Sequence, residues 1–212
     1  MKIKFKTESN SEVGSGGYVV ATEVVAMLES HPAAREETVR GLREFWEGQK
    51  RLTTGDSTGA LDMLRRAHAR FESVPEARLL LGVTKSRLAA AYASLQAFDK
   101  AVGYAEDCIA IVAGVKRLSL TEAEAHVNLA NSLGLLGKRD ESEKHYEHAE
   151  AILRSLPGTA GSLETLESNR ELVLAHASEM GSDRPFGAVA GIIAFAAAGL
   201  AALIVFLVWR NL

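Results

Sequence analysis

The sequence predicts an all-α protein, a solenoid of about three helical hairpins with capping helices, followed by a single transmembrane helix. Two observations carry this prediction. Comparison of the chain with itself aligns residue 48 with residues 89 and 130, and many neighbouring positions align in the same way. A period of about 41 residues indicates stacked hairpins of helices. Near the end of the chain, residues 186–209 form a stretch of 24 residues without a charge or a proline, long enough to cross a bilayer as a helix.

The repeat places small side chains at fixed intervals and larger ones about a turn away. Small residues are expected where two helices cross closely, and the larger ones fill the space beside the crossing. The aligned sets are Gly48, Ala89 and Ala130; Ala60, Ala101 and Ser142; Leu64, Ala105 and Tyr146; Ala67, Cys108 and Ala149; and Phe71, Val112 and Leu153.

Each unit is predicted to be a first helix, a short turn and a second helix. The turns fall at residues 54–57, 95–99 and 136–140. Gly55 and Gly137 can adopt the left-handed conformation that ends a helix. Asp56, Asp99 and Asp140 are predicted to cap the second helices.

The repeat resembles the tetratricopeptide repeat (TPR) in its long form, as found in kinesin light chains. The motif Asn-Leu-Ala-x-x-Leu-x-x-x-Gly-Lys at 128–138 carries the resemblance, with a second match at 87–101 and a third at 41–75. The resemblance spans about residues 38–156. It implies a solenoid whose first helices line a concave groove that binds a protein partner. The groove residues that it implies are Gln49, Arg87, Ala90, Asn128 and Asn131.

One branch of the family holds the acidic C-terminal tail of a chaperone through a clamp of lysine, asparagine and arginine side chains. The matching positions in this chain are Phe45, Gln49, Arg87, Glu124 and Asn128. Phe45 and Glu124 replace the lysines, so the resemblance does not extend to that clamp.

Shorter segments flank the repeats. Residues 1–17 are predicted to be flexible, although the alternating Lys2–Lys6 stretch also fits a strand added to a partner or a basic tether to lipid headgroups. Residues 18–32 are predicted to form a capping helix, with Val20, Val24, Met27 and Leu28 on one face. This helix either packs on the first repeat or lies in the groove. Residues 33–180 form the predicted TPR domain, which Pro32 opens and which a capping helix, starting after Ser162, closes.

A short linker at 181–185 leads to the predicted membrane helix at 186–209. Because only three residues follow it and no N-terminal signal peptide is present, the pattern is typical of a tail-anchored protein whose large domain faces the cytoplasm. An abundance of alanine, glycine and arginine favours a bacterial inner membrane. Small residues recur along one stripe of the helix and predict a helix partner in the bilayer: Gly187, Gly191, Ala194, Ala198 and Ala201.

Composition and motifs argue against several functions. The formal net charge of −3 does not fit a nucleic-acid binder. No phosphate loop, nucleophile elbow or zinc-protease motif occurs, so we predict no catalytic residue, cofactor or metal, and no enzyme. His145 and His148 share a helix face, but we expect them to lie on a solvated surface. The single cysteine, Cys108, is expected to be a small buried hydrophobic residue.

The sequence therefore predicts a membrane-anchored TPR adaptor or scaffold. Its expected partners are a protein segment in the groove, membrane lipid and a helix in the bilayer. The alternative is a permanent accessory subunit of a larger membrane complex.

Overall fold

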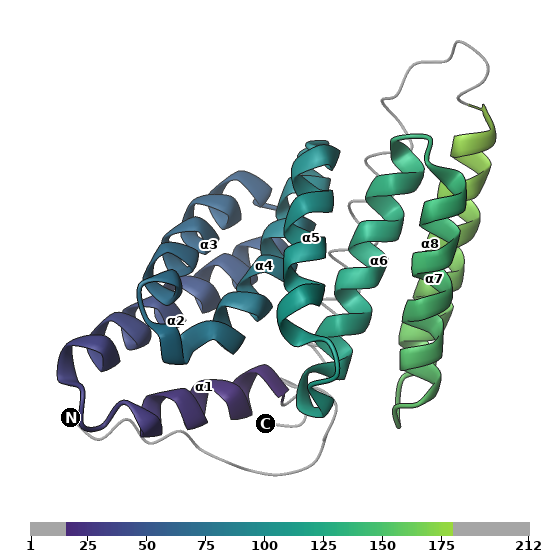
Figure 1. Cartoon of the computed structure of the whole chain (residues 1–212). Helices are drawn as coiled ribbons and strands as arrows, with labels where there is room; N and C mark the ends of the chain where they lie inside the picture. Colours follow the sequence, from purple (N-terminus) through teal and green to yellow (C-terminus); the bar gives the residue numbers. More distant parts are fainter. Residues whose placement is uncertain (1–15, 180–212) are drawn as a thin grey trace.

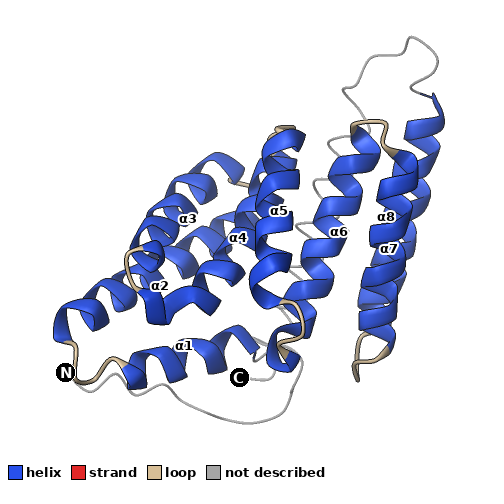
Figure 2. Cartoon of the chain, in the orientation of Figure 1, coloured by secondary structure: helices blue, strands red, loops and turns tan. Residues whose placement is uncertain are grey.

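The computed structural model describes residues 16–179, which form a solenoid of helical hairpins without a strand in that range (Figures 1 and 2). Helix α1 (Gly16–Met27) precedes three hairpins. Each hairpin pairs one helix with the next: α2 (Pro32–Thr53) with α3 (Ser57–Glu72), α4 (Arg78–Ser94) with α5 (Phe98–Val112), and α6 (Ser119–Leu135) with α7 (Arg139–Arg154). Short 3-10 helices, η1 (Pro75–Ala77) and η2 (Lys116–Leu118), lead into α4 and α6, and α8 (Ala160–Glu179) closes the array.

The helix boundaries repeat with the period that the sequence predicts. The second helices begin at Ser57, Phe98 and Arg139, and the helices after the first hairpin begin at Arg78, Ser119 and Ala160. Both series advance by the same interval that separates position 48 from position 89. The turns repeat in the same way, since the left-handed backbone conformation recurs at Gly55 (φ 82°), Gln96 (φ 59°) and Gly137 (φ 79°). Helix α8 therefore occupies the position of a fourth first helix, the last helix of the described range.

Small residues allow the two helices of a hairpin to approach closely. Ala60, Ala101 and Ser142 are fully buried, as are Ala67, Cys108 and Ala149. A Cβ atom at Gly48 would come within 2.8 Å of Leu64 Cγ on the facing helix. Such a contact is closer than packed carbon atoms tolerate, so the small residues set the spacing of the helices.

The hairpins stack into two layers. The first helices α2, α4, α6 and α8 form an inner layer in which each packs on the next, and α3, α5 and α7 lie outside them. Figure 1 shows the successive hairpins side by side along the array. The inner layer is the surface on which a TPR-like groove is expected.

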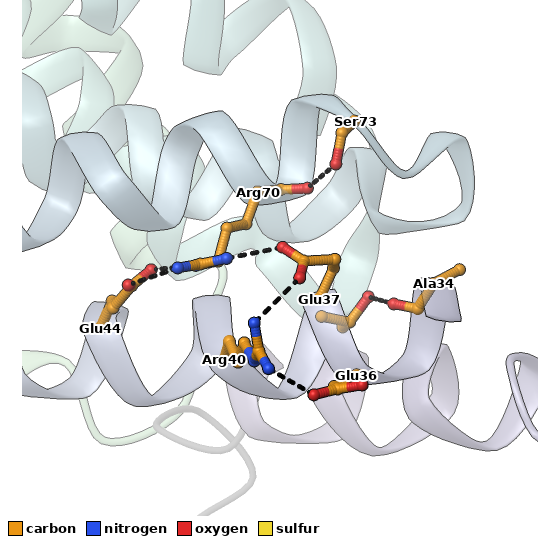
Figure 3. A network of polar contacts seen from close by, with 8 residues as sticks. Ala34, Glu36, Glu37, Arg40, Glu44, Arg70 and Ser73 are labelled. Atoms are coloured by element: carbon orange, nitrogen blue, oxygen red, sulfur yellow. Dashed lines mark hydrogen bonds and ion pairs between the residues drawn. The ribbon is translucent and has the colours of Figure 1, made fainter. Parts of the chain in front are cut away.

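A branched ion-pair network joins the two helices of the first hairpin (Figure 3). From α3, the Arg70 guanidinium donates to both Glu44 oxygens, at 2.7 and 3.1 Å, and to Glu37 at 2.6 Å. Arg40 continues the network to Glu36 and Glu37. The two carboxylates raise the pKa of Arg70 above its ordinary value through these hydrogen bonds. A paired, two-pronged contact of this kind fixes the orientation of a helix as well as stabilising it.

The prediction of three aspartate caps is correct only for the first turn. Asp56 Oδ1 accepts a hydrogen bond from the Gly59 amide at 2.9 Å and caps α3. The equivalent positions in the next two hairpins are Ala97 and Lys138, which make no side-chain cap. Asp99 and Asp140 lie within the first turn of their helices, where their charge favours the helix dipole instead.

Helix α1 packs on the first hairpin, which is one of its two expected positions, but it also contacts helices beyond that hairpin. Val20, Val24 and Leu28 are buried, as their spacing predicts. However, α1 packs against α2, α4, η1 and η2, and Arg117 pairs with Glu23 at 2.9 Å. The helix thus lies across the connections between hairpins, along the lower edge of the array in Figure 1. It ties the first hairpin to the start of the third.

The sequence predicts Ser162 as the cap of α8. In the structure α8 begins at Ala160, so Thr159 is the residue that precedes the helix. The Thr159 hydroxyl donates to the carbonyl of Leu153 at 2.7 Å and holds the start of α8 against the end of α7. No described helix is long and apolar enough to cross a membrane. Of the predicted flexible segment 1–17, residues 1–15 lie outside the described residues, and residues 16 and 17 begin α1. The linker at 181–185, the membrane helix at 186–209 and its stripe of small residues also lie outside the described residues.

Candidate functional site

The inner layer presents chemically different side chains at equivalent positions of the three hairpins. Trp46 on α2, Arg87 on α4 and Asn128 on α6 are each one period of the repeat apart. The same holds for Gln49, Ala90 and Asn131, three residues further along each helix. Because the hairpins share one register, each set occupies one level of the inner layer. We refer to these six residues as the inner row.

An ion pair joins Arg87 of the inner row, on α4, to Glu124 on α6. Arg87 Nη2 lies 3.0 Å from Glu124 Oε2, and the Glu124 side chain is only 5% exposed. Two charges so far from water are costly unless each is paired and hydrogen-bonded. The pairing is incomplete, because Arg87 Nε and Glu124 Oε1 have no hydrogen-bond partner in the described part of the chain.

Asn128 forms a second link between the same two helices. Its side-chain amide donates to the Ser86 carbonyl on α4 at 3.4 Å. The Ser86 hydroxyl itself is buried without a partner among residues 16–179. The junction of α4 and α6 therefore holds both the ion pair and unused hydrogen-bonding atoms.

The structure places the other predicted groove residues less uniformly. Asn131 is buried, and its Oδ1 accepts a hydrogen bond from the Tyr146 hydroxyl of α7, which leaves only Nδ2 unpaired in the described structure. Gln49 is also buried, and its Oε1 lacks a partner within the described range. Ala90 is buried and contributes no polar group. Arg87 and Asn128 thus come together at one junction, whereas Gln49 stands apart on α2 and Asn131 also serves the packing of its own hairpin.

Sequence reasoning missed one residue of the inner row. Trp46 is 43% exposed, and its ring meets Phe45 edge to face with the centroids 5.1 Å apart. Large aromatic side chains that remain exposed are common anchors of protein interfaces. The signal was present in the sequence, because Trp46 is one period before Arg87 and two before Asn128.

The expectation that His145 and His148 face solvent is wrong for His145. Its Nδ1 lies 3.0 Å from Nδ1 of His126 on α6, and the His126 ring also stacks on that of His148, with centroids 5.3 Å apart. The three rings form one cluster between α6 and α7. Among residues 16–179, no group of three or more histidine, cysteine or acidic side chains is arranged to hold a metal ion.

Cys108 is buried as expected, and this determines its chemistry. Burial raises the pKa of its thiol to about 12, with a further upward contribution from Glu124. The thiolate is the nucleophilic form of cysteine, so this side chain stays protonated and unreactive near neutral pH.

In comparisons with known proteins, no model of a protein family matches the chain, and neither a curated protein nor a solved structure does. The inner row and the residues around it are therefore the basis on which a function is proposed.

Proposed function

We propose that this protein is a membrane-anchored, TPR-like adaptor or scaffold whose inner layer binds a segment of a partner protein, and that it is not an enzyme. The observation that carries the proposal is the set of unpaired hydrogen-bonding atoms on neighbouring inner helices. These atoms are Gln49 Oε1 on α2, Ser86 Oγ and Arg87 Nε on α4, and Glu124 Oε1 and Asn131 Nδ2 on α6.

A buried polar atom without a partner costs about 1–3 kcal/mol. Native proteins contain few such atoms, and each calls for an explanation. Five on one side of three adjacent helices fit a surface that is completed by another molecule. The set includes donors and acceptors, which matches the alternating carbonyl and amide groups of a polypeptide backbone.

Trp46 gives this surface an accessible point of first contact. Gln49, Asn128 and Asn131 are each buried, so a partner reaches them only after the inner layer opens. Trp46 is far more exposed and lies on the same layer. The partner segment therefore carries an apolar side chain for Trp46, followed by backbone that engages the polar junction of α4 and α6.

Charge favours a neutral partner segment over an acidic tail. Arg87 is the inner-row cation, and Glu124 already neutralises it at 3.0 Å. A carboxylate ligand would compete with Glu124 and leave that side chain buried without its partner, which typically costs several kcal/mol. The inner row thus departs from a carboxylate clamp.

The proposed anchor is the apolar stretch 186–209. We propose that it lies in a bacterial inner membrane, with the helical domain on the cytoplasmic side. Gly191→Ile tests the proposed helix partner in the bilayer. The substitution keeps the stretch apolar but blocks close approach of a second helix. Crosslinking to the membrane partner should fall while the variant still inserts into the membrane. Unchanged crosslinking would contradict the proposal that the stripe of small residues packs against a second helix.

Trp46→Ala tests the binding surface. The full-length protein and its variant are extracted in mild detergent, and recovery of co-purifying proteins is compared by quantitative mass spectrometry. Truncating a well-packed aromatic anchor commonly costs about 2 kcal/mol or more, about a 30-fold loss of affinity. Leu95→Ala is the matched control, since Leu95 is similarly exposed but lies in the turn after α4. Equal recovery from all three proteins would refute this binding surface.

Trp46 is a cleaner probe than Arg87 or Asn131. Arg87 neutralises a buried carboxylate and Asn131 is hydrogen-bonded to Tyr146. Alanine at either position would lower the stability of the fold as well as weakening binding.

The second candidate is a permanent accessory subunit whose inner layer is always occupied. The depth at which Glu124 and Asn131 are buried favours it. Stoichiometric recovery of one partner indicates a subunit, and substoichiometric recovery of a partner indicates an adaptor.

A further inference from the structure

Three histidines meet on the side of α6 that faces away from the inner row. A rotation of about 100° per residue puts His126 roughly opposite Glu124 and Asn128 on the helix. The His126 ring stacks on both His145 and His148, with centroid distances of 5.2 and 5.3 Å, and the His145 and His148 centroids are 6.2 Å apart, so the three rings form a triangle. One ring comes from α6 and two from α7, so the cluster joins the two helices of the third hairpin.

The shortest contact in the cluster, between two imidazole nitrogens, can hold only one hydrogen atom. His126 Nδ1 and His145 Nδ1 are 3.0 Å apart, so one nitrogen donates a hydrogen bond and the other accepts it. If both imidazoles are protonated, each Nδ1 carries a hydrogen and neither has a lone pair to accept it. The hydrogen bond is then replaced by repulsion between two cations.

His148 contributes the third ring of the cluster beside this pair. Its Nδ1 donates to the Lys144 carbonyl at 2.6 Å. This bond holds the His148 ring against that of His126, with the centroids 5.3 Å apart.

The surroundings of the cluster oppose protonation of His126 and of His145. Burial, followed by the charges of His145 and His148, lowers the pKa of His126 to about 4. Burial and then His148 lower the pKa of His145, while Glu106 of α5 and Glu141 of α7 act in the opposite direction.

Two cations on the other helices packed against α6 and α7 are paired with carboxylates. Arg87 of α4 binds Glu124, and Arg170 of α8 binds Glu143 and Glu150. Glu106 and Glu141 are the two carboxylates whose charges favour protonation of His145.

We propose that this histidine cluster is an acid-sensitive latch, which holds α7 against α6 when its imidazoles are neutral and releases α7 when a second imidazole is protonated. Histidine is suited to this role because its ordinary pKa lies within the physiological range. The latch also affects the inner row, since Tyr146 of α7 donates to Asn131 of α6. The effect on the inner row is the only part of this proposal that rests on the proposed binding function.

The direction of the pH effect follows from the lowered pKa of His126. The unfolded chain, with an ordinary histidine pKa of 6.5, takes up a proton at a pH where the folded chain, at about 4, does not. Stability is therefore fully present above about pH 6.5 and falls as the pH drops toward 4. At pH 5, His126 alone raises the equilibrium constant for unfolding roughly 20-fold relative to neutral pH.

Chemical unfolding of the full-length protein in mild detergent, followed by circular dichroism at pH 7.5 and pH 5.0, tests the latch. His126→Phe keeps an aromatic ring in the stack but cannot bind a proton. We expect the ratio of the unfolding constants at the two pH values to be at least 10-fold smaller in this variant than in the wild type. His145→Phe serves as the second variant where His126→Phe does not fold.

His31→Gln is the matched control, because His31 is exposed in the turn between α1 and α2; it should keep the wild-type ratio. Wild-type pH dependence in both phenylalanine variants would overturn the latch. Stabilisation of the wild type by added Zn²⁺ at pH 7.5, reversed by a chelator and lost in His126→Phe, would show a metal site and overturn it as well. The measurement needs no partner, so its result is independent of the proposed binding function.

Discussion

Gly134 offers a direct test of the fourth inner helix. It lies near the end of α6, and a Cβ atom built on it would come within 2.1 Å of Val173 Cγ1 on α8 and 3.1 Å of Ser142 Oγ on α7. Packed carbon atoms rest at about 3.5–4.0 Å, so Gly134→Ala forces α8 to move by more than an ångström. Val173 is fully buried among Phe98 and Leu135 and has little freedom to turn away.

The expected cost is the difference between two opposing effects. Overpacking a core costs about 1–3 kcal/mol, whereas replacing glycine by alanine inside a helix stabilises by roughly 0.5–1 kcal/mol. A net loss of about 1–2 kcal/mol should lower the melting temperature by about 5 °C, at about 2–4 °C per kcal/mol for a chain of this size.

Gly103→Ala is the matched control, because Gly103 lies on the exposed side of α5 and a Cβ there meets no atom within 4 Å. It should raise the melting temperature by about 2–3 °C. Thermal unfolding of the full-length variants in detergent measures both shifts. A second comparison adds Val173→Ala to Gly134→Ala, and the double variant should be at least about 1 kcal/mol more stable than the sum of the single effects. If Gly134→Ala stabilises as Gly103→Ala does, α8 does not sit over α6 and the reasoning fails.

Three further predictions concern the rest of the array. Ala101→Leu adds three heavy atoms at a fully buried helix crossing and should cost about 1–3 kcal/mol; an unchanged melting temperature would count against the register of the repeat. Arg70→Met removes the bridge to Glu37 and Glu44 and should cost about 1 kcal/mol, a difference that added salt at about 1 M reduces; salt-independent loss would assign the effect to packing. A chain ending at residue 185 should leave the membrane fraction and keep its helical circular dichroism, and retention in the membrane would contradict the proposed anchor.

The repeat could be predicted from the sequence because its packing depends on side-chain size. A helix crossing demands a small residue wherever it occurs, so Gly48, Ala89 and Ala130 recur at the same interval as the crossings themselves. The same interval fixed the hairpin boundaries to within a residue or two. Even the left-handed turn position follows it, although glutamine replaces glycine at residue 96.

Features that depend on side chains from different helices could not be predicted in this way. His145 looked solvent-exposed because its neighbours along α7 are charged, yet the deciding contact is with His126 on α6. Likewise, Asn131 was placed in the groove from its register, whereas its bond to Tyr146 depends on where α7 crosses α6. The position of α1 across the hairpin connections has the same origin, since its apolar face fits more than one surface.

The repeat contains positions where all three hairpins use the same kind of side chain and positions where they differ, and the proposed function depends on the second kind. At the first-helix position occupied by Gly48, Ala89 and Ala130, all three hairpins use a small side chain, because the neighbouring helix leaves no room for another. Two residues earlier in each hairpin, the side chains are tryptophan, arginine and asparagine. Packing alone would not favour three such different residues at one level of the solenoid. The change from aromatic to charged to amide side chains gives this level of the inner row an apolar end at α2 and a polar end at α6. If the proposed function is correct, a partner segment with one apolar and one polar end binds in one direction only, and reversing the order of its residues should abolish binding while leaving its composition unchanged.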